Sequence, residues 1–259
     1  MEIIVIDDGS TDDSLGVIRS FDEQVMWRTD ENRGACHARN KGLALAEGNY
    51  VQFLDADDLL LPEKLKHQAQ LIGKSTTRPD LVAASYKKRD VDGNEHTVRV
   101  GNTDEWIDLI KKKLGITSSN LWRTAFLKKI GGWNEDMPSS QEAELMYRML
   151  QARASLTYDD SCLTVVRQQK GSIGTSVKGN WKPENRERYY RLRGEIIQYL
   201  KDNDLLTEAR KRVGLNAIFR QIRLLYEYDP EEAVSLHEKV IPEDFRPQIG
   251  FNTRQYIYF

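Results

Sequence analysis

Residues 32–58 read NRGACHARNKGLALAEGNYVQFLDADD, and this stretch is the strongest indication of the fold. Residues 34–47 are rich in Ala and Gly, which predicts a helix that packs closely against a sheet. Residues 50–54 form an apolar run of strand length, which ends at three carboxylates within the four positions 55–58. A helix that leads into a buried strand with acidic residues at its end is typical of an α/β protein with a site at the edge of its sheet.

The same alternation continues on both sides of this stretch. Residues 2–6, EIIVI, predict a strand covered on both faces, and Asp7 and Asp8 follow it directly. A short strand is expected at 25–28 and a helix from Pro62 onward. We therefore predict an α/β fold with a mostly parallel sheet flanked by helices, in which both acidic clusters lie at the carboxyl ends of strands.

The rest of the chain completes this domain and adds a helical region. Residues 80–100 predict a hairpin around Asp92-Gly93, a two-residue turn. The other expected elements are helices at 103–113, 141–151, 207–226 and 230–239, a helix after Pro183, and strands at 117–123 and 155–166. We predict an α/β domain over residues 1–178 and a C-terminal helical appendage over residues 179–259.

Composition argues against several classes of function. The formal net charge is −2, so no basic excess indicates nucleic-acid binding. The apolar runs are too short to span a bilayer, and no signal peptide is visible. Cys36 and Cys162 lack CxxC spacing, which favours free, buried thiols, with a single disulfide as the alternative. We expect a cytoplasmic protein, with peripheral contact at the inner face of the membrane as the alternative.

The acidic clusters each have a functional and a structural interpretation. Asp55, Asp57 and Asp58 repel one another unless a cation neutralises them, and hard divalent ions prefer carboxylate oxygens. The cluster therefore predicts a metal that also binds a diphosphate, although an isolated Asp-x-Asp is more often a solvated turn or a helix cap. Asp7 and Asp8 predict contact with a base or a ribose hydroxyl, or equally a cap for the next helix.

Two further residues carry chemistry of the same kind. Arg39 can reach a phosphate or stack on a base, and an ordinary exposed arginine is the alternative. Glu142 lies in the first turn of the helix expected at 141–151, with Ser140 as its expected cap. Glu142 is a candidate general base, and plain helix capping is the alternative interpretation.

The order and spacing of these motifs are more specific than any one of them. The four motifs are IIVIDDGSTDDS (3–14), the stretch 32–58, TSSNLWRTAFLKKIGGWNE (117–135) and SSQEAELMYRML (139–150). Together they resemble the inverting family 2 glycosyltransferases with the GT-A fold, over about residues 2–175. The resemblance implies transfer of a sugar from a nucleoside-diphosphate sugar, a UDP-sugar above all, to an acceptor hydroxyl with inversion.

The resemblance also implies a role for each candidate residue. Asp7 and Asp8 match the pair that contacts the nucleoside, and Arg39 matches an arginine near the base. Asp55 matches the residue that contacts the ribose, and Arg167 falls where a mobile loop closes over the diphosphate.

The remaining two roles concern the metal and the chemistry. Asp57, with help from Asp55, matches the metal ligand, and the implied cofactor is Mg²⁺ or Mn²⁺. Glu142 matches the catalytic base, and Arg148 resembles a structural arginine of the same helix.

The chain departs from the family pattern in two places. The family begins with a strand that ends in a Pro-x-Tyr-Asn loop, and this segment is absent upstream of Met1. We therefore expect Met1 to be an internal or misplaced start of a longer protein. Glu142 stands where Asp is commoner, and Ala143 stands where an aromatic residue is common. These departures motivate an alternative function, a truncated or degenerate transferase fold that acts as a non-catalytic binding or assembly module.

The expected partners are a nucleotide-sugar donor and a saccharide or lipid-linked acceptor, and a homo-oligomer is compatible with the sequence. A basic, aromatic stretch in the helical region suggests contact with anionic lipid. Its residues are Arg186, Arg188, Tyr189, Tyr190, Arg191 and Arg193. A solvated basic helix face with tyrosines at the edge of the core is the favoured alternative.

Overall fold

The chain folds into two compact units. The first comprises Met1–Gly101 and Leu114–Lys170, and the second comprises Asn102–Lys113 and Gly171–Phe259. The computed structural model describes residues 1–21, 23–137, 139–168, 183–227 and 229–241. The predicted domain boundary between residues 178 and 179 lies outside the described residues and stays a prediction.

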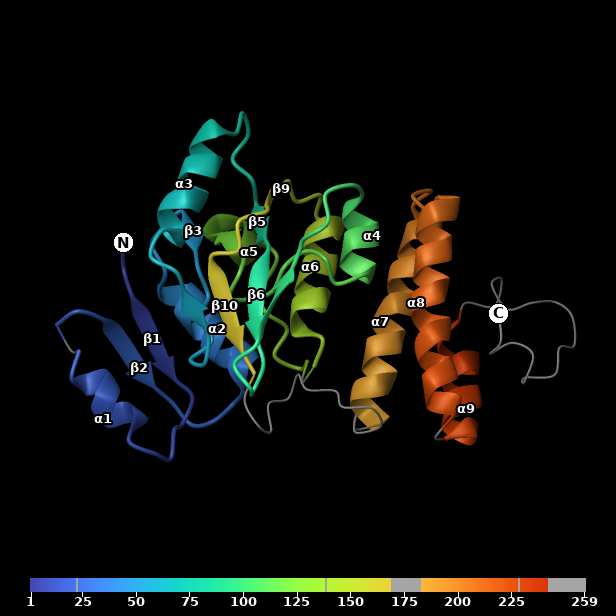
Figure 1. Ribbon diagram of the computed structural model, residues 1–259, viewed down its shortest axis with the longest axis horizontal. Helices are drawn as coiled ribbons and strands as arrows, with labels where there is room; N and C mark the ends of the chain where they lie inside the picture. The colour runs from blue at the N-terminus through green and yellow to red at the C-terminus, as the bar shows by residue number, and fades with distance from the viewer. Residues whose placement is uncertain (22, 138, 169–182, 228, 242–259) are drawn as a thin grey trace, which may run out of the picture. The chain divides into compact units, whose positions relative to one another are not determined.

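The first unit carries the strands and most of the short helices (Figure 1). In chain order its elements are β1 (Ile4–Asp7), α1 (Ser14–Arg19), β2 (Met26–Thr29), α2 (Ala35–Leu45), β3 (Tyr50–Val51), β4 (Leu59–Leu60), α3 (Lys64–Lys74), β5 (Leu81–Ala84), β6 (Tyr86–Arg89), β7 (Glu95–Val98), β8 (Leu121–Arg123), α5 (Thr124–Lys129), α6 (Gln141–Gln151), β9 (Leu156–Asp159) and β10 (Thr164–Arg167). The predicted alternation of strands and helices is confirmed, and α6 has the bounds that the sequence predicts.

The described strands of this unit form three sheets with mixed directions. Their orders are β1-β2, β3-β8-β5-β9 and β4-β10-β6-β7. Parallel pairs join β1 to β2, β5 to β9 and β6 to β10, whereas the other pairs are antiparallel. The α/β class is confirmed, but the expectation of a mostly parallel sheet is wrong. A tight hairpin such as β6–β7 can only join antiparallel strands, and β8 adds two more antiparallel pairs.

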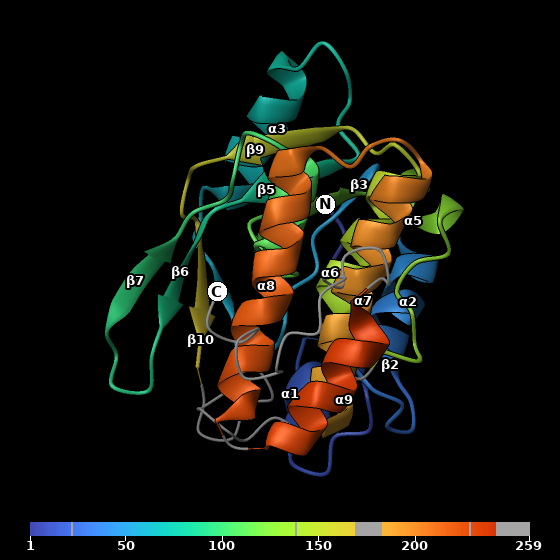
Figure 2. The ribbon, with the colours of Figure 1, turned by 90° about the vertical axis from the view of Figure 1, so that its right-hand side faces the viewer.

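Two predicted strands divide where the chain passes from one sheet to another. Residues 81–89 form β5 and β6, which are separated by Ser85 and belong to different sheets. The strand expected at 155–166 likewise becomes β9 and β10. The predicted hairpin around Asp92-Gly93 is present as β6–β7, and it extends from its sheet in Figure 2.

The strand β1 is less covered than its apolar sequence predicts. Ile4, Val5 and Ile6 are half-buried, and Ile3 is 48% exposed. Within the described residues β1 pairs only with β2, and α2 packs against it. The expectation of a strand covered on both faces is therefore wrong, because a strand packed on both faces would bury these three side chains fully.

The core of the first unit surrounds β5, whose four residues are all buried. Phe53, Trp122 and Trp133 pack edge to face beside it, with ring centroids 5.5–6.5 Å apart. Aromatic clusters of this kind contribute strongly to core stability. Because Phe53 precedes the acidic segment 55–58 by two residues, the cluster anchors the start of that segment.

Both cysteines are free thiols, as the sequence predicts. Cys36 is buried on α2, and this burial raises its pKa to about 11, which disfavours the reactive thiolate. Cys162 is half-buried between β9 and β10.

The second unit is helical and consists of α4 (Glu105–Ile110), α7 (Pro183–Asp202), α8 (Glu208–Tyr226) and α9 (Pro230–Val240). The last three helices lie side by side in Figure 2 and share a buried apolar cluster. The helix α4 packs on α8, although it lies between β7 and β8 in sequence. None of the helices in the described ranges combines the length and apolarity needed to cross a bilayer.

Much of the basic, aromatic stretch on α7 lies inside this helical unit. Arg193 is 1% exposed, its guanidinium lies 3.4 Å from the Tyr189 ring centroid, and it donates to the Tyr189 carbonyl at 3.0 Å. Burial lowers the pKa of Arg193 to about 10. Tyr190 is also buried, whereas Arg191 is exposed and pairs with Glu187. The side chain of Arg186 lies outside the description. Tyr189, Tyr190 and Arg193 therefore act as core residues, and contact with lipid stays a prediction.

Asp104 joins α4 to α8 and gives a test of the helical unit. Its carboxylate accepts the Trp106 and Ile107 amides at 3.0 Å and pairs with Arg210 at 2.9 Å. We expect Asp104→Ala to lower the free energy of unfolding by about 1–3 kcal/mol, because both the cap and the ion pair are lost.

Urea denaturation followed by circular dichroism measures this change. Asp104→Asn is the matched control: its amide oxygen keeps the cap, so we expect a smaller loss. Equal losses in the two variants would show that the cap does not hold α4.

Candidate functional site

The acidic segment after β3 forms a turn held from two sides. The Asp58 amide donates to the Asp55 carbonyl at 2.9 Å, which closes the turn. Arg39 donates to Asp55 Oδ1 at 2.7 Å. From the other side, the Arg167 amide donates to Asp58 Oδ1 at 3.2 Å, and Arg167 Nε donates to the Asp57 carbonyl. The structure thus brings Arg39, Asp55, Asp57 and Arg167 together from widely separated positions in the sequence.

The three carboxylates of this turn have different surroundings. Asp58 is 7% exposed, and its burial, reinforced by the neighbouring Asp55 and Asp57 carboxylates, raises its pKa. Asp55 is half-buried and neutralised by Arg39. Asp57 is half-buried, and no side chain in the described part of the chain bonds its carboxylate. Asp57 is therefore the carboxylate of this turn that is best placed to meet a ligand.

Arg39 is a largely buried cation that links three elements. Its side chain is 12% exposed, and it stands on α2 with the guanidinium 4.7 Å from the Trp133 ring centroid. Besides Asp55 it contacts Gln141 Oε1, at 2.9 Å, at the start of α6. A guanidinium suits such a position, because its planar fork donates in several directions while its face packs on an aromatic ring. The alternative of an ordinary exposed arginine does not hold.

Asp7 and Asp8 are used to shape the loop that follows β1. Asp7 is buried and accepts Thr29 Oγ1 at 2.7 Å and the Ser10 amide at 3.2 Å, and hydrogen bonds from these two residues lower its pKa. Asp8 accepts the amides of Arg33 and Gly34, at 2.9 and 2.8 Å, where α2 begins.

Capping chemistry is thus present at the first acidic pair. Asp8 caps the start of α2, whereas the N-cap residue of α1 makes no side-chain cap bond. Among the described residues no hydrogen bond or ion pair joins Asp7 or Asp8 to the acidic turn or to Glu142. The link runs through α2, which Asp8 anchors and which carries Arg39.

Glu142 stands in the first turn of α6, as predicted, but its helix is not capped by Ser140. Ser140 has a left-handed backbone, with φ 59°, and makes no side-chain cap bond. The expected cap is wrong because Ser140 has this left-handed backbone instead of the extended backbone that a capping residue normally has. Glu142 Oε1 instead accepts Thr117 Oγ1 at 2.7 Å. On the same helix, Arg148 donates to the carbonyls of Ile130 and Gly132, at 2.8 and 2.7 Å.

The structure adds residues that the sequence analysis missed. One is Tyr86 on β6. Burial, together with the nearby Glu142 and Asp58 carboxylates, raises the pKa of Tyr86 to about 12. Ser118 is fully buried, and its hydroxyl accepts the Asp55 amide at 3.2 Å. The available sequence signal was the run of small polar residues in TSSN, directly before β8.

A network of polar side chains fixes Gln52, which lies three residues before the acidic turn. Gln52 donates to the Ser118 carbonyl at 3.0 Å and accepts a bond from Lys64. Lys64 is 1% exposed and also donates to Gln68 Oε1 at 2.8 Å. Desolvation lowers the pKa of Lys64 to about 7, a shift that Asp159 opposes.

The donor set fits a metal that is shared with a ligand. The described residues contain no group of three or more side chains able to hold a metal ion on their own. Mg²⁺, however, is commonly held by one or two carboxylates together with phosphate oxygens of a substrate. Asp57, with Asp55 beside it, can supply the one or two carboxylates of such a site.

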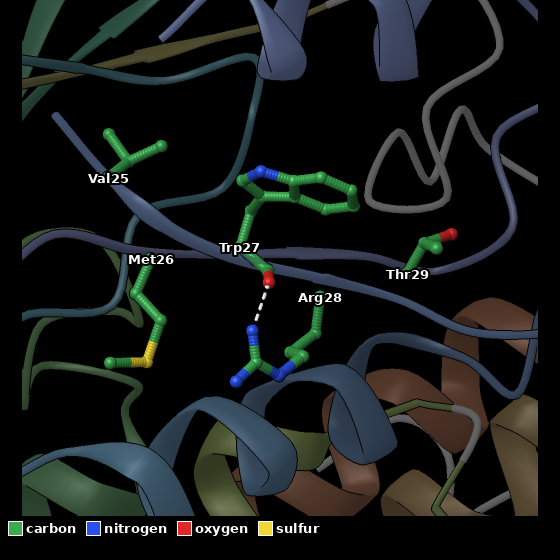
Figure 3. Close-up of a pocket in the computed structure, with 5 residues that line it drawn as sticks. All are labelled: Val25, Met26, Trp27, Arg28 and Thr29. Carbon is green, nitrogen blue, oxygen red and sulfur yellow. Dashed lines mark hydrogen bonds between the residues drawn. The ribbon is translucent and has the colours of Figure 1, made fainter. Parts of the chain in front are cut away.

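A hollow along β2 lies apart from these residues (Figure 3). It is lined by Val25, Met26, Trp27, Arg28 and Thr29, and Arg28 Nη1 turns back onto the Trp27 carbonyl at 2.8 Å. None of the candidate site residues lines this hollow, so the polar network around the acidic turn remains the candidate site.

Comparison with known sequences gives a consistent family. The model of glycosyl transferase family 2 matches residues 1–128. An uncharacterized glycosyltransferase of Rickettsia conorii is 26% identical over 174 residues, which is 63% of this chain and 28% of that protein. The succinoglycan biosynthesis protein ExoU of Rhizobium meliloti is 30% identical over 217 residues, 76% of this chain and 61% of that protein. The chain thus spans only part of the length of these relatives.

Comparison with solved structures gives the same fold. S. aureus TarS 1–349 in complex with UDP-GlcNAc has a TM-score of 0.66 and 20% identity, over 94% of this chain and 73% of that chain. Its complex with UDP has a TM-score of 0.56 and 19% identity, over 99% and 79% of the two chains. The chain has the GT-A-like α/β fold, and its matched segment, residues 1–128, belongs to glycosyl transferase family 2.

Proposed function

We propose that this chain transfers a sugar from a UDP-sugar to an acceptor hydroxyl, with inversion at the anomeric carbon and with help from Mg²⁺ or Mn²⁺. The observation that carries the proposal is the polar network in which the acidic turn, Arg39 and Glu142 meet. The TarS complexes with UDP-GlcNAc and UDP support a uridine nucleotide as the donor class.

The donor would lie along the acidic turn. Asp7 and Asp8 would contact the nucleoside, since each carboxylate has lone pairs beyond the two bonds described above. Asp55 would contact the ribose with Arg39 close to the base. Arg167, already bonded to the backbone of Asp57, would lie over the diphosphate.

Asp57, with Asp55, would hold the divalent ion. When bound there, a divalent ion would neutralise the charge that develops on the departing diphosphate. The contribution of the chain is to hold the turn in place through Arg39 and Ser118, so that the Asp57 carboxylate, which has no side-chain partner among the described residues, would face the ligand.

Glu142 would act as the general base. Its Oε1 holds the Thr117 bond, which leaves Oε2 to take the proton from the acceptor hydroxyl. The acceptor oxygen then attacks the anomeric carbon on the face opposite the diphosphate, the bond to the diphosphate breaks, and the configuration inverts. The acceptor would be a saccharide or a lipid-linked saccharide.

A non-catalytic binding or assembly role is the second candidate. Two features favour this role: β1 is only partly buried, and among the described strands it pairs only with β2, which leaves one wall of the nucleotide region thinly supported. Calorimetry with UDP and Mn²⁺ separates the two: tight binding supports the transferase, whereas absence of binding supports the module.

The Asp57→Asn variant tests the metal ligand. We expect its affinity for UDP in Mn²⁺ to fall at least about 10-fold, because the amide lacks the negative charge that a hard cation prefers. Isothermal titration with and without Mn²⁺ measures the change. Asp92→Asn, an exposed carboxylate at the hairpin tip, is the matched control and should bind normally. Unchanged metal-dependent binding in Asp57→Asn would contradict the assignment.

The Glu142→Gln variant tests the base. We expect UDP binding to persist while turnover falls about 10²- to 10⁴-fold, because the amide cannot accept the proton. UDP release from a panel of UDP-sugars that includes UDP-GlcNAc measures turnover. Glu47→Gln, an exposed glutamate after α2, controls for loss of charge. Wild-type turnover in Glu142→Gln would remove Glu142 from the reaction.

A further inference from the structure

Two adjacent buried hydroxyl residues connect the donor side of the site to its base. Thr117 and Ser118 are 1% and 0% exposed and lie just before β8. Thr117 Oγ1 donates to Glu142 Oε1 at 2.7 Å. Ser118 Oγ accepts the Asp55 amide at 3.2 Å, and Ser118 partly offsets the rise that burial causes in the pKa of Asp58. One peptide bond therefore separates the contact with the base from the contacts with the acidic turn.

We propose that Thr117 is a positioning residue that sets the direction of the Glu142 carboxylate relative to the donor. This inference rests on the proposed transferase function. Glutamate has three side-chain torsions, so a half-buried carboxylate at the start of a helix has several rotamers available. A short bond from a β-branched, fully buried threonine restricts that choice, because threonine itself has few rotamers.

The backbone of this pair is fixed independently of Glu142. The Ser118 carbonyl accepts Gln52 Nε2 at 3.0 Å and Thr164 Oγ1 at 3.3 Å. These bonds tie the pair to the segment before the acidic turn and to β10. Thr117 therefore ties Glu142 to the same backbone segment whose Ser118 holds the acidic turn.

The arrangement also accounts for a glutamate in this position. Its side chain is one methylene longer than aspartate, which moves the carboxylate and adds a torsion. Catalytic geometry is sensitive to displacements of about 1 Å, so the longer arm needs a restraint. A single bond to Oε1 supplies it and leaves Oε2 toward the acceptor.

The experiment compares Thr117→Val with Thr117→Ser in the full chain. The substrate is the UDP-sugar of the panel that gives the fastest UDP release. We expect Thr117→Val to lower kcat about 10- to 100-fold with a donor KM within about 2-fold of wild type, because only the bond to the base is lost. Thr117→Ser, which keeps the hydroxyl, should recover most of kcat.

Substitution of the neighbouring residue, Ser118, is expected to change donor binding. Ser118→Ala should raise the KM of the donor and the Kd of UDP, since Ser118 holds the donor side. In the Glu142→Gln background, Thr117→Val should cause no further loss, because the two residues act as one unit.

Failure of the positioning role of Thr117 and failure of the proposed function give different results. If Thr117→Val turns over like wild type while Glu142→Gln is inactive, the positioning role is wrong and the proposed function stands. If Glu142→Gln is fully active, the proposed function itself fails. Equal loss of kcat in folded Thr117→Val and Thr117→Ser would also overturn the role, since it would assign the effect to packing. Should Thr117→Val not fold, Thr117→Cys, with a weak thiol donor of similar size, must show the same lower kcat at unchanged KM.

Discussion

The ion pair between Arg39 and Asp55 holds the candidate site together. A guanidinium that is 12% exposed needs a charged or polar partner on each side, because an unpaired buried charge is costly. Asp55, Gln141 and the face of Trp133 provide those partners. Asp8, in turn, anchors the helix that carries Arg39. Segments far apart in the chain thus meet at one cation, and the acidic turn is presented in a single orientation.

The second constraint is the repulsion among the three aspartates of the turn. Two of the three have a partner that offsets this repulsion: Arg39 pairs with Asp55, and the Arg167 amide donates to Asp58, whose pKa burial nevertheless raises. Asp57 receives no such neighbour within the described residues. A protein that stabilises two carboxylates and leaves the third half-exposed creates a place where a cation lowers the energy. The same framework reaches Glu142 through Thr117.

Local patterns predict the elements of this chain well, whereas long-range pairing escapes them. The α6 bounds and the hairpin at Asp92-Gly93 follow from periodicity and turn chemistry, which act over a few residues. The mixed sheets do not, because the direction of β8 is set by partners that lie far away in sequence. The acidic turn and Arg39 could be predicted from motif spacing. Tyr86 and Thr117 could not, since nothing in the sequence shows that Thr117 bonds the Glu142 carboxylate or that Tyr86 lies near it.

The proposed sugar transfer requires the Asp57 carboxylate to face the donor diphosphate while Arg39 keeps Asp55 in place. A crystal structure of the chain with UDP and Mg²⁺ tests this most directly. We predict an Asp57 oxygen about 2.1 Å from the metal, diphosphate oxygens completing its coordination, the Arg39–Asp55 pair intact and Glu142 on the side open to an acceptor. A nucleotide bound away from the acidic turn, or a metal held without Asp57, would contradict the account.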